Sequence, residues 1–259
     1  MAEKLKQKSA GNDTTEMAAD KRFGRYRKEN KQTIREPERK LNEKLEQLRK
    51  VWEKFEFSCV DLGNDPSEGK KRNYRNALIA LRGMPMTAKD IEGFSLAVLP
   101  NVFQKWDGVG DKAGFLLSAM INNCMERDFI VHTQHIAFEL NYLGYRNSKN
   151  IIVIGNAGSG LGCEMSKGSI LVKGSVTNYV GIDMNGGSIT VEGDAGYEVG
   201  SSMKTGIIII QGNTSHSVGA DMKGGQIYIE GNIESIARSN VDYIKHGKIF
   251  HKGKLIVDK

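Results

Sequence analysis

The segment SILVKGSVTNYVGIDMNGG, residues 169–187, decides the fold because the chain repeats its pattern in register. The next two segments, SITVEGDAGYEVGSSMKTG (188–206) and IIIIQGNTSHSVGADMKGG (207–225), have the same length and align without a gap. The pattern of an apolar run followed by Gly, Met and Gly extends over residues 150–231. The period of the pattern equals the length of these segments. A fixed period indicates a repeat architecture whose units bury their apolar faces by stacking.

Each unit predicts a short strand followed by corners. In one unit, Ile189 and Val191 alternate with Thr190 and Glu192, which is the pattern of a half-buried strand. A Gly beside Asn, Asp or Ser then turns the chain. So short a unit predicts one coil of a parallel β-helix, in which each strand pairs with the same strand of the next coil. The equivalent strands are expected at residues 151–154, 169–173, 188–192, 207–211 and 226–230.

Two features of the coils support this interpretation. The four equivalent methionines are expected to form a ladder in the interior, where a flexible side chain tolerates imperfect spacing; they are Met165, Met184, Met203 and Met222. The glycine-rich residues 155–162 follow a strand as a phosphate-binding loop would, but residues 163–167 are too short for the helix that such a site requires. We therefore interpret these glycines as corner residues.

The basic character of the chain belongs to its N-terminal part. The net charge is +6, and residues 1–55 hold 16 Lys and Arg against 10 Asp and Glu, whereas the remaining residues hold 21 of each kind. Residues 1–35 are almost free of aliphatic side chains and are expected to form a disordered basic arm. Residues 21–28 interleave aromatic and cationic side chains, which fits either RNA contact or a solvated arm.

Cysteine usage and hydropathy predict a cytoplasmic protein. The three cysteines, Cys59, Cys124 and Cys163, are far apart and form no C-x-x-C pair, so neither an iron–sulfur cluster nor a zinc site is indicated. This usage fits a reducing compartment. The sequence contains no apolar stretch of membrane-spanning length and no secretory signal.

Residues 36–149 are expected to form a mainly helical region, part of which caps the open end of the β-helix. A helix over residues 36–56 carries a heptad seam that fits packing either on the chain's own body or on a partner helix; its residues are Leu41, Leu45, Leu48, Trp52 and Phe55. A loop is predicted at 63–71 and a short helix at 73–82.

Two further helices and a connection complete the helical region. Thr87 and Asp90 predict a capping box for a helix that ends near Pro100. Asp111 is expected to cap the next helix, and residues 129–131 and 136–143 are expected to connect it to the first coil. After residue 231 the coil is longer, with Arg238 and Val241 at positions of the repeat's Gly and Met. This coil is the expected C-terminal cap, with strands at 248–252 and 254–258.

No catalytic, cofactor-binding or metal-ligating residue is predicted. His132 and His135 have a spacing that metal sites use, but no further ligand stands nearby, so we interpret them as an ordinary pair. No cofactor is indicated. Charged residues on the coils are interpreted as solvated faces that keep the solenoid in solution; they include Lys173, Glu192, Lys204 and Lys223.

The repeat resembles the GXGXG family, most clearly at residues 180–187 (VGIDMNGG) and 218–225 (VGADMKGG). That family includes the C-terminal domain of the glutamate synthase large subunit and a β-helical component of formylmethanofuran dehydrogenase. The resemblance covers residues 150–259 and implies a right-handed parallel β-helix. It further implies a platform for catalytic partners, because the chemistry of those enzymes lies in other domains or other chains.

Three functions are compatible with these patterns. The first is a non-catalytic scaffold that docks onto an oxidoreductase or amidotransferase-type partner, as the resemblance implies, or associates with itself. The second is a binding module tethered to RNA or another polyanion by the basic arm. An enzyme in its own right would need a nucleophile, a base and an oxyanion donor together, which spacing alone does not reveal.

Overall fold

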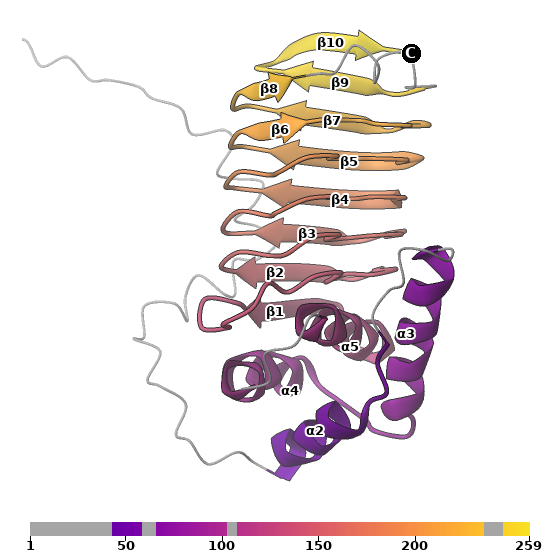
Figure 1. Ribbon diagram of the computed structural model, residues 1–259, viewed down its shortest axis with the longest axis vertical. Helices are drawn as coiled ribbons and strands as arrows, with labels where there is room; N and C mark the ends of the chain where they lie inside the picture. The colour runs from indigo at the N-terminus through magenta and orange to yellow at the C-terminus, as the bar shows by residue number, and fades with distance from the viewer. Residues whose placement is uncertain (1–42, 59–65, 103–107, 236–245) are drawn as a thin grey trace, which may run out of the picture. The chain divides into compact units, whose positions relative to one another are not determined.

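The computed structural model describes residues 43–58, 66–102, 108–235 and 246–259. A small helical region precedes a parallel β-solenoid of about 6 turns with coils of about 19 residues. The strands lie one above another, and the helices lie at the end where the stack begins (Figure 1). The expected arm at residues 1–35 lies outside the described residues, as do Leu41, Cys59, Arg238 and Val241.

The helical region contains four α-helices and two short irregular turns among the described residues. None of these helices has the length and apolar character that a membrane-spanning segment requires. The elements are α2 (Glu43–Lys54), α3 (Pro66–Ala80), α4 (Ala88–Gly93), a π-helical turn (Phe94–Val98), a 3-10 turn (Leu99–Asn101) and α5 (Val109–Asn123).

The seam of α2 packs on the chain's own body. Leu45, Leu48, Trp52 and Phe55 are all buried in the same apolar core as α4 and α5. Of the two arrangements that the heptad spacing allows, the structure therefore has the intramolecular one. This seam is not available to a partner helix.

Local signals in the helical region are confirmed in part. The Thr87 hydroxyl accepts a hydrogen bond from the Asp90 N–H, and the Asp90 carboxylate accepts one from the Thr87 N–H, which completes the predicted capping box. The predicted loop at 63–71 is wrong in its second half, because α3 begins at Pro66, a residue that favours the first helical turn. Asp111 lies inside the first turn of α5, and Gly108 takes the capping position.

In the described part of the chain, one sheet of eight strands runs along the solenoid, and its strands are parallel from β1 to β9. The central residues of the strands pair in register, so that Ile151, Ile170, Ile189 and Ile208 are successive partners, and the register shifts at the start of β4, between Asn185 and Ser188. The strands are β1 (Asp128–His132), β2 (Asn150–Ile154), β3 (Ser169–Val172), β4 (Asn185–Val191), β5 (Thr205–Ile210), β7 (Gln226–Ile229), β9 (Lys248–His251) and β10 (Lys254–Asp258).

The solenoid begins before the boundary expected at residue 150. β1 pairs in parallel with the whole of β2, so residues 128–149 form a first coil rather than a connection. This coil lacks the Met of the repeat, but it keeps the Leu143–Gly144 pair, which corresponds to Leu161–Gly162 one coil later. Gly144 adopts the same left-handed backbone as Gly162. The step between these two glycines is shorter than the step from Gly162 to Gly181, so the first coil is irregular.

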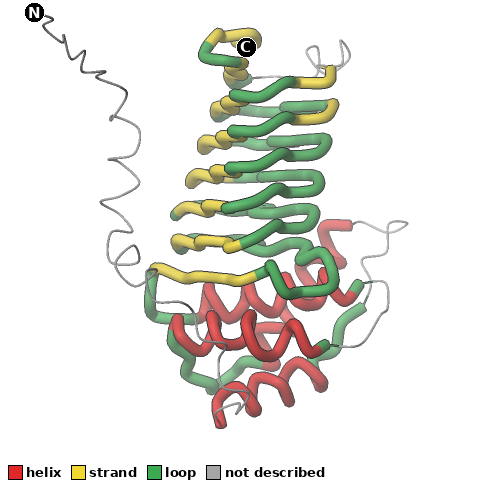
Figure 2. Tube along the Cα trace, turned by 90° about the vertical axis from the view of Figure 1, so that its left-hand side faces the viewer, coloured by secondary structure: helices red, strands yellow, loops and turns green. Residues whose placement is uncertain are grey.

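A second, discontinuous ladder joins the coils on another face. Isolated parallel bridges link Ala157, Val176, Ala195 and Thr214 in succession. Within the described ranges, only the upper coils form strands there, namely β6 (Thr214–His216) and β8 (Ile233–Ser235). Figure 2 shows the strands of the main sheet stacked along one side and the loops that complete each coil.

The predicted methionine ladder is confirmed. All four methionines are fully buried inside the coils. Each methyl group lies against a glycine of the following coil: a Cβ on Gly187 would be 2.7 Å from the Met165 Cε, and a Cβ on Gly225 would be 2.6 Å from the Met203 Cε. The glycines of the repeat therefore make room for the methionines, which explains why both recur with one period.

The C-terminal end of the stack is an antiparallel hairpin. β10 pairs with β9 in antiparallel fashion, with a bulge between Leu255 and Val257. The two expected terminal strands are confirmed. The reversal of direction ends the parallel ladder at β9.

Candidate functional site

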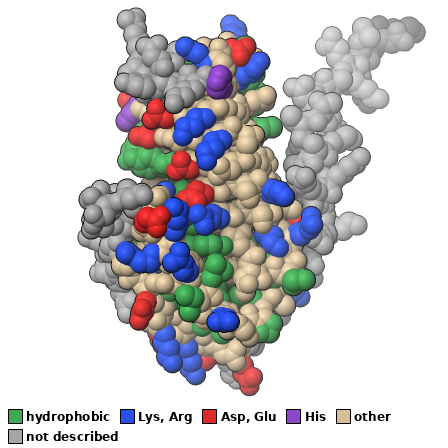
Figure 3. Space-filling view, turned by 90° about the vertical axis from the view of Figure 1, so that its right-hand side faces the viewer, with side chains coloured by type: hydrophobic (Ala, Val, Ile, Leu, Met, Phe, Trp, Pro, Cys, Tyr) green, Lys and Arg blue, Asp and Glu red, His purple; other side chains and the backbone are tan. Residues whose placement is uncertain are grey.

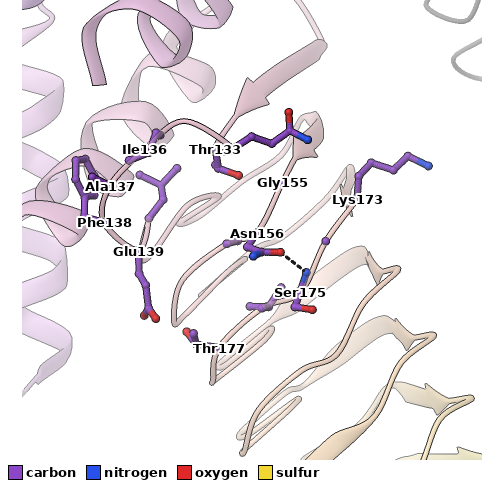
Figure 4. Close-up of a pocket in the computed structure, with 15 residues that line it drawn as sticks. Thr133, Ile136, Ala137, Phe138, Glu139, Gly155, Asn156, Lys173, Ser175 and Thr177 are labelled. Atoms are coloured by element: carbon purple, nitrogen blue, oxygen red, sulfur yellow. Dashed lines mark hydrogen bonds between the residues drawn. The ribbon is translucent and has the colours of Figure 1, made fainter. Parts of the chain in front are cut away.

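A groove opens on the solenoid between the first coil and the two that follow (Figure 4). The loop of residues 133–140 forms one wall, and residues 155–157 and 173–177 form the other. Its volume is about 740 Å³, which lies within the range of about 300–1,000 Å³ found for ligand sites.

The groove exists because the first coil departs from the repeat. In the later coils, residues equivalent to Ala157 form bridges to their neighbours, but among the described residues no bridge joins the 133–140 loop to Ala157. The two coils meet again where the Gly158 N–H donates to the Leu140 C=O at 3.0 Å. The loop therefore leaves the ladder and returns to it, and the groove lies between.

At this place Asn156 presents main-chain groups that no described residue pairs with. In the following coil, the Ser175 C=O accepts a hydrogen bond from the Ala157 N–H, and the Ser175 N–H donates to the Asn156 Oδ1, both at 2.9 Å. The same two bonds recur in the later coils, at Asp194, Asn213 and Asn232. Within the described part of the chain, neither the N–H nor the C=O of Asn156 has a partner. By the geometry of the repeat, both groups point toward the first coil.

The side chains of the groove are both apolar and charged. Ile136 and Phe138 are half-buried and pack against the core. Glu139 is exposed and forms no ion pair with any described residue. Lys173 is already paired with Glu192 of the next coil. Among the residues that the structure describes, Glu139 thus offers the groove a carboxylate without an ion-pair partner, beside the apolar side chains of Ile136 and Phe138.

A second cluster of reactive groups joins α3 to the solenoid. The Lys70 Nζ lies 3.5 Å from the Cys163 Sγ and 3.9 Å from the Asp183 Oδ2. Cys163 is fully buried against Phe115 and Tyr145, and burial raises the pKa of its thiol to about 12. A thiol that stays protonated and has no access to solvent is a poor nucleophile. We therefore assign this cluster to packing of α3 on the coils.

Nearby tyrosines support the same junction. The Tyr145 hydroxyl donates to the Glu164 Oε1 at 2.9 Å, and the Arg146 Nε donates to the Glu164 Oε2 at 2.8 Å. Burial, together with the Glu164 carboxylate, raises the pKa of Tyr145, and burial raises the pKa of Tyr142 to about 12. These phenols are held in their neutral form.

The outward face of the main sheet carries an apolar row in register. Ile130, Ile152 and Leu171 are successive partners, and after Thr190 the row continues to the end of the stack. Its upper members are Ile209, Tyr228 and Phe250. The last two rings stack with their centres 4.5 Å apart. Apart from Ile152, which is buried, these residues are partly exposed.

Of the residues weighed from the sequence, Lys173 and the start of the glycine-rich segment, residues 155–157, line the groove, and the others lie apart from it. The His132 Nε2 lies 3.1 Å from the Glu92 Oε1, and His135 is exposed without lining the groove. The described residues contain no group of three or more side chains that could hold a metal ion. The Lys204 Nζ donates to the Asn185 Oδ1 at 2.9 Å, as expected of a solvated face. The glycine-rich residues 155–162 form a corner that leads to β3 without a helix.

Sequence reasoning did not find the groove. The shortened step between Gly144 and Gly162 was available as a signal of an irregular first coil. This spacing indicates that a first coil exists, but it does not indicate that the loop of residues 133–140 departs from the ladder of bridges that begins at Ala157.

The fold places the protein in the class of parallel β-solenoids. Comparison of the sequence with protein-family models gives no match, and comparison with curated proteins gives none either. The resemblance of the repeat to the GXGXG family therefore stays a prediction.

Proposed function

We propose that the protein is a non-catalytic scaffold that docks onto a partner protein through the faces of its solenoid. The observation that carries the proposal is the in-register apolar row on the outward face of the main sheet, which runs from β1 to β9. Rows of identical spacing on a stiff stack of coils make a regular surface, and apolar patches of this kind mark interaction sites. The resemblance to the GXGXG repeat favours a cytoplasmic oxidoreductase or amidotransferase-type enzyme as the partner.

A charge placed in the apolar row tests this proposal. The tagged full-length chain is purified from its native source, and proteins present in stoichiometric amount are identified by mass spectrometry. Ile209→Lys is expected to lose the partner, whereas Lys223→Glu, an exposed change away from the sheet face, is expected to retain it. Both variants should unfold at the temperature of the wild-type protein. Recovery of the chain without any stoichiometric protein contradicts the proposal.

A second candidate function is tethering to RNA or another polyanion. The observation that favours it is the excess of Lys and Arg in residues 1–55, most of which lie outside the described residues. The face that carries α3 shows Lys and Arg side chains with Asp and Glu among them, rather than a continuous basic surface (Figure 3). We therefore attribute any polyanion binding to the N-terminal arm. RNA binding that persists after deletion of residues 1–31, or that is insensitive to salt, contradicts this.

A further inference from the structure

The groove between the first coil and the next two has features of an incomplete ladder. Wherever a regular coil lies beneath another, an extended backbone supplies an N–H to the carbonyl at the Asn156-equivalent position, and a side-chain oxygen accepts from its N–H. At Asn156 the described part of the first coil supplies neither. The later coils therefore show which chemical groups complete the edge: a backbone N–H and an oxygen acceptor, and an extended peptide offers both in its N–H and C=O groups.

We propose that this groove binds an extended peptide segment of the partner protein, which pairs with the main chain of Asn156. This inference rests on the proposed scaffold function and names the surface that takes one part of the partner. Strand addition to an open ladder gives affinity through main-chain hydrogen bonds, and the neighbouring side chains give specificity.

The side chains of the groove define the peptide. Glu139 has no cation among the described residues, so a Lys or Arg of the peptide complements it. Ile136 and Phe138 expose part of their surface beside it, which favours an apolar residue next to the cation. Lys173 does not compete for an acidic residue, because Glu192 already neutralises it. The occupant is therefore an extended segment with one basic side chain flanked by apolar ones.

Synthetic peptides test the proposal on the full-length chain. One pool alternates Val and Thr around a single Lys, and the matched pool has Glu in place of the Lys. Binding is measured by fluorescence anisotropy, and contacts are located by NMR. The Lys pool is expected to bind the wild-type chain. Its affinity for the Glu139→Lys variant is expected to be at least about tenfold lower, which is about 1.4 kcal/mol. Its affinity for Glu230→Lys, which changes an exposed carboxylate outside the groove, is expected to equal that for the wild-type chain.

Main-chain pairing is tested separately from charge. Methylation of the peptide nitrogens removes the donors and is expected to abolish binding, while the Asn156 amide of the protein should become protected from exchange when the unmethylated pool binds. Equal binding of the Lys and Glu pools, no binding of either, or an Asn156 amide that is unchanged overturns the inference.

The native complex separates the two proposals. If the partner is recovered with the wild-type chain and equally with Glu139→Lys, the scaffold function stands and the peptide groove is wrong. If no stoichiometric partner is recovered with the wild-type chain, the scaffold function itself is wrong.

Discussion

The regular coils and the first coil share a corner but differ in what lies between the corner and the strand. In the regular coils, residues 150–231, main-chain hydrogen bonds and the bridges from Ala157 to Thr214 join the second face from one coil to the next. In the first coil, residues 128–149, the loop at 133–140 leaves that ladder and a groove opens. The comparison shows that stacking of identical coils supplies hydrogen-bond partners to the backbone. Where one coil departs from the repeat, backbone N–H and C=O groups are available to a ligand.

The largest expected effect tests the junction between these regions. Gly168 and Gly253 have nearly the same backbone, with φ of +76° and +72°, but a Cβ on Gly168 would collide with the Lys149 carbonyl of the first coil, whereas a Cβ on Gly253 meets nothing. Gly168→Ala is expected to lower the free energy of unfolding by roughly 3–5 kcal/mol, the sum of backbone strain and overpacking.

Gly253→Ala is the control for this prediction and is expected to cost only the strain, roughly 1–2 kcal/mol. Chemical denaturation of the two variants measures both values. Equal losses would show that the first coil is not packed against the second as described.

The methionine ladder tests the interior of the regular coils. Met203→Ala removes a fully buried side chain and is expected to cost about 2–4 kcal/mol. Met125, which is 95% exposed, supplies the control, and Met125→Ala is expected to change stability by less than about 0.5 kcal/mol. Thermal unfolding compares them. A small effect at Met203 would mean that the ladder does not determine the stability of the coils.

The junction of α3 with the coils predicts a loss of stability in alkaline solution. The pKa of Cys163 is about 12 in the folded protein, above its ordinary value of about 8.5. The folded state therefore holds this proton more tightly, so its contribution is complete below about pH 8.5 and is lost as pH rises toward about 12.

Denaturation between about pH 8 and about pH 10 should reveal a fall of about 1–2 kcal/mol for the wild-type protein. Cys163→Ala should show a smaller fall over the same interval, although it is less stable throughout because it leaves a cavity. Identical slopes for the two proteins would contradict the assignment of the thiol to a buried position.

The smallest expected effect lies in the helical region. Thr87→Ala removes the hydroxyl that caps α4 and is expected to cost about 1 kcal/mol. Lys89→Ala, an exposed change in the same turn that touches neither cap hydrogen bond, is expected to cost less than about 0.5 kcal/mol. Chemical denaturation distinguishes the two, and equal values would show that the capping box contributes nothing.

The sequence predicts the regular coils better than it predicts the first coil and the helical region. The period of the glycines and methionines predicts the coils, because a buried Met and its facing Gly constrain each other. The first coil was not predicted, because it has no Met and because its corner glycine, Gly144, lies closer to Gly162 than the repeat requires. In the helical region, Thr87 signals its own cap, and Pro66 favours a first helical turn, but the composition of residues 63–71 favoured a loop and hid the start of α3. The groove depends on unpaired backbone groups, which no residue pattern records.

Amide hydrogen exchange of the free protein tests the central claim most directly. It compares the Asn156 N–H with the equivalent N–H groups of Ser175, Asp194 and Asn213, each of which is bonded to the coil below. We expect the Asn156 amide to exchange about two- to tenfold faster than the other three, since one hydrogen bond is worth about 0.5–1.5 kcal/mol. An Asn156 amide as protected as its equivalents would show that the first coil closes the ladder, and that the molecule has no open edge to offer.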